Sequence, residues 1–240
     1  PGYDIGVKLN GKIAKGLVNY DIGGYGGKGQ GITSTTNDNS LAARIAINPL
    51  GELPYSEADL EPTVKPLVSV GVNYFYDRFQ FTRGATAGTS TFETTNQNFM
   101  SSNGWLTSAN AFNRGIQTEK VAVNLFGVDT AFKWMGAYAV AEYLLGQAEG
   151  DRSGALLRAH GYFLQAGYCV IPKTLEVAAR WSYVDPNRSA SNDLRSELGG
   201  AVSYYFNKHN LKLQGDVINL HTQRSASVET DEMQYRLQAQ

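Results

Sequence analysis

Residues 197–217, ELGGAVSYYFNKHNLKLQGDV, decide the fold, because apolar and polar side chains alternate along both arms of this stretch. A β-strand sends successive side chains to opposite faces, so the two arms form a hairpin closed by a turn at Asn207-Lys208-His209. One face carries the apolar side chains of Leu198, Val202, Tyr204, Phe206, Leu211, Leu213 and Val217. The two faces of such a hairpin meet two different environments. These are either the core of a sandwich and water, or the lipid and the lumen of an outer-membrane barrel.

The composition fits alternating strands joined by polar loops. Of 240 residues, 26 are Gly and 14 are Tyr, and only 18% are charged. The mean hydropathy is −0.30, and no run approaches the ~18 consecutive apolar residues that a spanning helix needs. Any membrane span in this chain is therefore expected to be a β-strand, whose backbone groups pair with neighbouring strands.

Charge and reactive side chains argue against several functional classes. The net charge of −1 leaves no basic footprint for nucleic acid. The single cysteine, Cys169, excludes an internal disulfide framework and a cysteine-based zinc cluster. His160, His209 and His221 are scattered and stand in no GxSxG or HExxH context. We therefore expect no enzymatic activity, no bound metal and no cofactor.

Alternating runs bounded by turn residues predict eleven strands in one all-β domain over residues 1–240. The expected architecture is a transmembrane antiparallel up-and-down β-barrel. The predicted strands cover residues 3–9, 12–22, 41–48, 67–80, 121–133, 137–147, 157–170, 174–183, 194–206, 210–221 and 231–240.

The predicted connections alternate between tight and long. Tight turns are expected at Asn10-Gly11, Met135-Gly136, Ile171-Pro172-Lys173 and Asn207-Lys208-His209, and long polar loops at residues 23–40, 81–120, 148–156, 184–193 and 222–230. Outer-membrane barrels place short turns at the periplasmic rim and long loops outside the cell. Residues 81–120 are thus expected to form a long extracellular loop, which either stays at the surface or folds inward as a constriction. Residues 49–66, rich in proline and acids, are expected to form an ordered periplasmic connection.

If the apolar side chains face lipid, the opposite faces point many charged side chains inward. Charges in a dry β-core are costly unless they are paired, so this many on one side of a sheet argues for water there. Each residue could also simply brace the wall through a cross-strand ion pair. The predicted pore-lining residues are Lys15, Arg44, Asp129, Lys133, Glu142, Glu176, Arg180, Glu197, Lys212, Asp216 and Arg236.

Five strings, in order along the chain, resemble the phosphate-selective porin O and P family of Gram-negative outer membranes. They are RIAINPLGE at 44–52, YSEADLE at 55–61, GYFLQAGYCVIPKTLEVAARWSYVDP at 161–186, ELGGAVSYYFNKHNLKLQGDV at 197–217 and RLQAQ at 236–240. The resemblance implies a sixteen-stranded barrel, commonly trimeric, that passes small anions. The chain would then be its C-terminal portion, with a leader and about five strands expected before it.

Family members are known for a ladder of arginines, and Arg44, Arg180 and Arg236 match positions in family-like strands. The resemblance thus implies an outer-membrane porin for passive diffusion of small solutes, in particular anions such as phosphate. Outer-membrane lipid, lipopolysaccharide and two further copies of the chain are its expected partners. A general anion or mixed small-solute porin fits the same residues. Two other classes stay open: a barrel scaffold that holds a partner protein in its lumen or on its loops, and a soluble β-sandwich lectin or adhesin.

Overall fold

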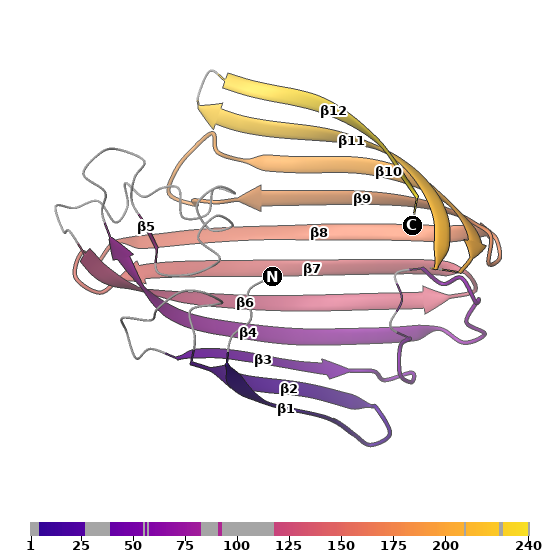
Figure 1. The fold of residues 1–240 in the computed structure, drawn as a ribbon, viewed down its shortest axis with the longest axis horizontal. Helices are drawn as coiled ribbons and strands as arrows, with labels where there is room; N and C mark the ends of the chain where they lie inside the picture. Colours follow the sequence, from indigo (N-terminus) through magenta and orange to yellow (C-terminus); the bar gives the residue numbers. More distant parts are fainter. Residues whose placement is uncertain are drawn as a thin grey trace.

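The computed structural model describes residues 5–26, 39–54, 56, 58–82, 91–92, 118–208, 210–225 and 228–239. Eleven long strands follow one another around a single sheet, each antiparallel to the next (Figure 1). They are β1 (Gly6–Ile13), β2 (Val18–Tyr25), β3 (Ser40–Ile47), β4 (Leu67–Thr82), β6 (Thr118–Trp134), β7 (Ala137–Gly150), β8 (Leu156–Ile171), β9 (Leu175–Asp185), β10 (Arg195–Asn207), β11 (Leu211–Ser225) and β12 (Val228–Ala239). A two-residue strand, β5 (Thr91–Phe92), pairs with the end of β4.

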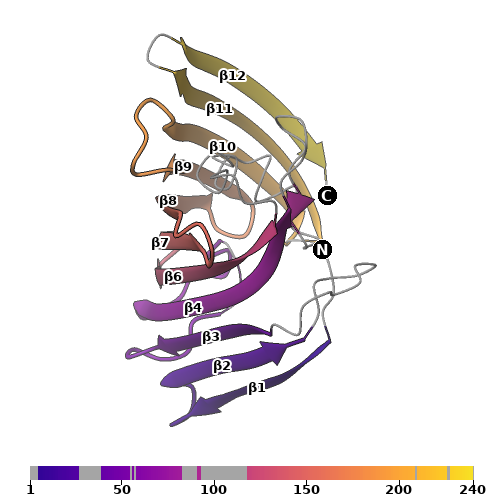
Figure 2. The ribbon, with the colours of Figure 1, turned by 90° about the vertical axis from the view of Figure 1, so that its left-hand side faces the viewer.

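The sheet curves like a segment of a barrel wall, with one concave and one convex face (Figure 2). The prediction of an all-β, up-and-down antiparallel fold is confirmed. The sheet is open, because β1 and β12 are not paired with each other in the part that the structure describes. Among the described residues, no helix could cross a membrane.

Strand direction sorts the connections into two ends of the sheet. We call the end that holds residues 14–17, 48–66, 135–136, 172–174 and 208–210 the turn end, and the opposite end the loop end. The predicted tight turns after β6, β8 and β10 lie where expected. Residues 81–120 fall mostly outside the described residues.

The first hairpin differs from its prediction. Asn10 and Gly11 lie inside β1, and the chain turns at residues 14–17, where Ala14 and Lys15 have φ values of 50° and 57°. Gly11 is needed within the strand because a Cβ atom there would lie 2.8 Å from Cζ of Tyr20 on β2. The predicted place of Lys15 on a strand is therefore wrong, since it belongs to the turn.

Two of the predicted long loops are also corrected. β7 and β8 are longer than predicted, so the expected loop at 148–156 shrinks to residues 151–155. β11 and β12 extend to Ser225 and from Val228, which leaves only two residues between them. Residues 221–225 of the sequence are all polar, so alternation gives no signal there and the strand end was predicted too early.

The convex face carries an exposed apolar band across most of the sheet. Its side chains are 37–63% exposed and include Val70, Val72, Tyr74, Phe126, Val128, Trp181, Leu198, Val202 and Val217. Aromatic rings meet within this band: Tyr162 stacks on Tyr183 with ring centroids 5.1 Å apart and lies edge-on to Trp181. A continuous exposed apolar belt with aromatic residues is typical of a wall that faces lipid.

The concave face is not polar throughout. Near the loop end it carries a fully buried apolar cluster that includes Phe79, Phe81, Val121, Val123, Ala148 and Leu157. The sequence prediction placed apolar side chains outward and did not anticipate this cluster. Farther toward the turn end the same face becomes charged.

Candidate functional site: the concave wall

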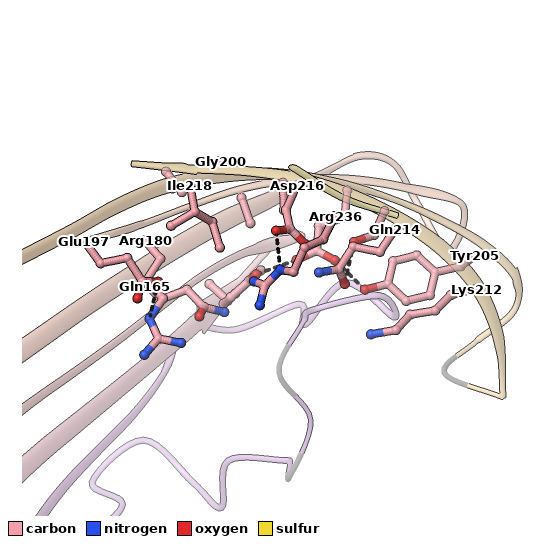
Figure 3. Close-up of a pocket in the computed structure, with 17 residues that line it drawn as sticks. Gln165, Arg180, Glu197, Gly200, Tyr205, Lys212, Gln214, Asp216, Ile218 and Arg236 are labelled. Carbon is pink, nitrogen blue, oxygen red and sulfur yellow. Dashed lines mark hydrogen bonds and ion pairs between the residues drawn. The ribbon is translucent and has the colours of Figure 1, made fainter. Parts of the chain in front are cut away.

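Six of the eleven predicted pore-lining residues surround one hollow of about 230 Å³ on the concave face. Strands β9 to β12 supply them, and the side chains of Arg180, Lys212 and Arg236 point into the space under the curved sheet (Figure 3). They are Glu176, Arg180, Glu197, Lys212, Asp216 and Arg236. The alternation of side chains along each strand places them on one face.

The arginines of this hollow pair with acids on neighbouring strands. Arg236 Nε donates to Asp216 Oδ1 at 2.8 Å, and Arg180 Nε lies 4.0 Å from Glu197 Oε1. The two members of each pair are unequally exposed. The arginine side chains are 61% and 50% exposed, whereas Asp216 and Glu197 are 6% and 28% exposed. The long guanidinium side chains thus reach beyond the short carboxylates into the hollow.

A second charged group lies on the same face nearer to β1. Arg44 of β3 reaches over β4 and contacts both carboxylate oxygens of Asp129 on β6, at 2.5 Å and 3.2 Å. Gly71 of β4 permits this crossing, because a Cβ atom there would lie 2.7 Å from Arg44 Nη2 and 2.6 Å from Asp129 Oδ2. Glu142 stands directly opposite Asp129 on β7. Again the arginine, 44% exposed, extends beyond its partner, which is 21% exposed.

Glu176 is held by two tyrosines rather than by a cation. Tyr138 OH donates to Glu176 Oε1 and Tyr205 OH donates to Oε2, and the glutamate is only 4% exposed. The Tyr138 ring lies across Gly167, where a Cβ atom would be 2.4 Å from Cε1 of that ring. This Tyr138–Glu176–Tyr205 bridge joins β7, β9 and β10 across the wall.

Lys133 lies on the predicted face but under a cover. Its ammonium donates to Ser56 O and Ser56 Oγ, both at 2.5 Å, and to Ala58 O and Pro54 O at 3.2 and 3.3 Å. The residue is 2% exposed. This burial differs from the predicted exposure of Lys133 to a lumen.

The cover is the connection between β3 and β4, which folds against the turn end of the sheet. Asp59 Oδ2 accepts hydrogen bonds from the backbone N–H groups of Gly136 at 2.7 Å and Thr63 at 3.1 Å. Leu60 O accepts from Lys173 N at 3.2 Å. Ala58 and Leu60 pack with Tyr138, Cys169 and Tyr205 in a buried cluster. Residues 48–66 thereby contact the turns after β6 and β8.

A salt bridge ties the same connection to the turn after β10. Lys208 Nζ lies 2.7 Å from Glu61 Oε1. The hydrogen bond and attraction from Lys208, with a further contribution from Lys173, lower the pKa of Glu61 below its ordinary value. Residues 48–66 thus bind three successive turns of the sheet.

The sequence prediction missed the uncharged polar residues of the hollow. Gln165, Ser203, Tyr205 and Gln214 line it together with Tyr138. Period-two alternation from the charged residues on the same strands would have found them. No cluster of His, Cys, Asp and Glu able to hold a metal ion occurs among the described residues.

The comparisons with known proteins agree with this geometry. No curated protein matches the chain. A comparison with protein families matches residues 58–240 to the family described as phosphate-selective porin O and P. The matched region starts within the connection that covers Lys133 and includes β4 to β12. Because this match covers most of the sequence, the chain belongs to the phosphate-selective porin O and P family.

Proposed function

We propose that the protein is an outer-membrane porin through which small solutes, in particular anions such as phosphate, diffuse passively. The observation that carries the proposal is the unequal exposure within the ion pairs of the concave wall. Formal charge there is nearly balanced, but the cations extend into the space and the acids lie against the sheet. A solute that moves along the wall therefore meets guanidinium groups before it meets carboxylates.

The chemistry of these groups suits a small oxyanion. Arg180 and Arg236 approach their carboxylate partners through Nε, the nitrogen nearest the chain, and the forked end of each guanidinium lies beyond it. Guanidinium matches the geometry of phosphate oxygens and stays charged at any physiological pH. Lys212 adds a cation that is paired with no acid among the described residues. These groups raise the local concentration of anions in the lumen.

The two faces of the sheet support a membrane location. The convex apolar band fits lipid and the charged concave face fits water, as in the wall of a transmembrane barrel. In this orientation the turn end is periplasmic, the loop end is extracellular, and residues 48–66 form a periplasmic connection. The lipid and lipopolysaccharide of the outer membrane then contact the convex face, and three copies associate as the family resemblance implies.

Planar-bilayer recordings of the full-length protein test this proposal. In a KCl gradient, the reversal potential should show a preference for anions, and added phosphate should reduce the chloride current. Replacing Arg180 and Lys212 together by Gln should lower the anion preference, because two cations that line the hollow are lost. A preference for cations in the unmodified protein would exclude the anion assignment. Absence of any conductance would exclude the porin.

The matched control replaces an arginine on the other face. Arg78 of β4 lies on the convex side and pairs with Asp151 at 3.1 Å. Arg78→Gln removes the same charge from the protein but none from the concave wall. Its reversal potential should therefore equal that of the unmodified protein.

A further inference from the structure

A second hollow lies on the convex face, outside the candidate pore. It encloses about 290 Å³ between β6, β7 and β8 and the connection that follows β9. Its wall consists of Asn124, Phe126, Leu145, Gly146, Gln147, Arg158, Ala159 and Arg188. Asn124, Gln147 and Arg158 stand opposite one another on the three strands. The next row toward the turn end is Phe126, Leu145 and His160, of which the first two line the hollow.

The aromatic residues of the convex face indicate where this groove lies relative to the membrane. Val128, Tyr143, Tyr162 and Tyr183 form one row across four strands, and Tyr162 stacks on Tyr183. Gln147 lies four residues beyond Tyr143 toward the loop end, which is about 13 Å along a strand. Tyrosines of a barrel wall sit at the level of the lipid headgroups. Phe126 and Leu145 lie two residues beyond this row toward the loop end, and Asn124, Gln147 and Arg158 lie two residues farther out. The groove therefore extends outward from the edge of the apolar band and becomes polar at its outer end.

The charge of the groove is uniformly positive. Its two charged residues, Arg158 and Arg188, form no ion pair with the described residues, and no acid is among the residues that line it. Arg188 N donates to Arg158 O at 2.9 Å, so the connection after β9 holds the two arginines together. The nearby acid Asp185 does not pair with either arginine; its Oδ1 accepts a hydrogen bond from Asn187 N at 3.0 Å.

We propose that this groove binds the phosphate-bearing headgroup of a lipid in the outer leaflet. Arg158 and Arg188 contact the phosphate, Asn124 and Gln147 bind polar groups of the headgroup, and the apolar part of the lipid next to the headgroup passes Phe126 and Leu145 on its way to the tyrosine row. Two guanidiniums beside an apolar floor match a molecule that is anionic at one end and apolar at the other. The inference rests on the membrane location of the barrel and is independent of the solute that the pore passes.

Native mass spectrometry of the detergent-solubilised full-length protein tests the proposal. The probes are lipid A with two phosphates, lipid A with one phosphate, and phosphatidylcholine. We expect lipid A with two phosphates to bind most tightly and phosphatidylcholine most weakly. Arg158→Gln combined with Arg188→Gln should weaken lipid A binding by about tenfold or more, because charge-assisted hydrogen bonds to phosphate are lost. The same pair changed to Lys should retain most of the binding.

A control variant, a conductance measurement and a competition experiment complete the test of lipid binding. Arg78→Gln, which removes an already paired arginine from the same face, should leave lipid A binding unchanged. The Gln double variant should retain its conductance and ion preference, so a failure here is distinct from a failure of the porin proposal. Inorganic phosphate alone should not displace the lipid. Unchanged lipid A binding in the double variant, or displacement by inorganic phosphate, would overturn the proposal.

Discussion

Lys133 and Lys212 occupy equivalent places on the concave wall and differ in what covers them. Lys133 stands opposite Tyr138, and Lys212 stands opposite Tyr205, so the two lysines flank the same tyrosine–glutamate bridge. Lys133 is 2% exposed and its ammonium donates to four oxygens of Pro54, Ser56 and Ala58. Lys212 lines the open hollow (Figure 3).

The comparison shows that a strand's alternation assigns a side chain to a face, whereas the connections decide its role. Both lysines have the chemistry of a pore cation. Only Lys212 keeps that chemistry available to a solute, because residues 48–66 use the charge of Lys133 to anchor themselves. Lys133 therefore stabilises the turn end, whereas Lys212 contributes positive charge to the lumen.

The largest expected effect comes from Lys133→Met. Methionine keeps most of the volume but leaves the oxygens of Pro54, Ser56 and Ala58 without their shared donor. Removing one partner of a buried charged hydrogen-bond group costs about 3 kcal/mol. We expect the free energy of unfolding of the full-length protein to fall by that amount, measured by urea unfolding followed by tryptophan fluorescence in lipid vesicles. The ion preference in bilayers should not change.

Lys212→Met is the matched control. It removes the same group from the same face, but a half-buried cation that pairs with no acid among the described residues contributes little to stability, so the free energy of unfolding should change by less than about 0.5 kcal/mol. Its anion preference should fall instead. Equal losses of stability in the two variants would contradict the comparison, as would a loss of anion preference in Lys133→Met.

The bridge between the two lysines provides the next test. Glu176→Gln replaces a carboxylate that accepts from both tyrosines with an amide that has only one acceptor oxygen. Both buried tyrosine hydroxyls then lose their charged acceptor, and one of them faces an amide NH2 group instead of an acceptor, which together costs about 2 kcal/mol. The same urea unfolding should show this loss.

Glu197→Gln serves as the control for that change. Glu197 lies on the same wall and only 4.0 Å separates its Oε1 from Arg180 Nε, in a partly exposed pair. We expect a change in the free energy of unfolding within about 0.5 kcal/mol. If Glu176→Gln proves equally mild, the bridge does not hold the wall together.

Alternation alone was sufficient to predict the up-and-down order of the strands and the charged residues of the hollow, but not the first turn or several strand ends. The period-two pattern of residues 197–217 places Glu197, Lys212 and Asp216 on one side, and all three line the hollow. It succeeds because one face meets apolar surroundings and the other does not, so a one-residue slip would reverse every side chain. Arg180 and Arg236 follow by the same rule on β9 and β12.

The remaining features depend on contacts between distant parts of the chain. Asn10-Gly11 has the residues of a tight turn, yet Gly11 lies within a strand and leaves room for the side chain of Tyr20 on the neighbouring strand. Gly71 likewise provides room for a contact between Arg44 and Asp129, which lie 85 residues apart. The prolines and acids of residues 49–66 indicate an ordered segment but not that it covers Lys133. Such covers are set by tertiary packing, which a local pattern does not encode.

The smallest expected effect is on the salt bridge that closes the cover over Lys133. Lys208 lowers the pKa of Glu61 below its ordinary value of 4.5, so the folded state favours the ionised carboxylate. This contribution to stability is complete above pH 4.5 and is lost as the pH falls through the lowered pKa. We expect Glu61→Gln to lower the thermal transition slightly at neutral pH, and this difference should disappear as the pH falls through the lowered pKa of Glu61. Since the pair is exposed, added salt should shrink the difference at neutral pH. A difference that persists in acid would mean that Glu61 holds residues 48–66 through packing rather than through charge.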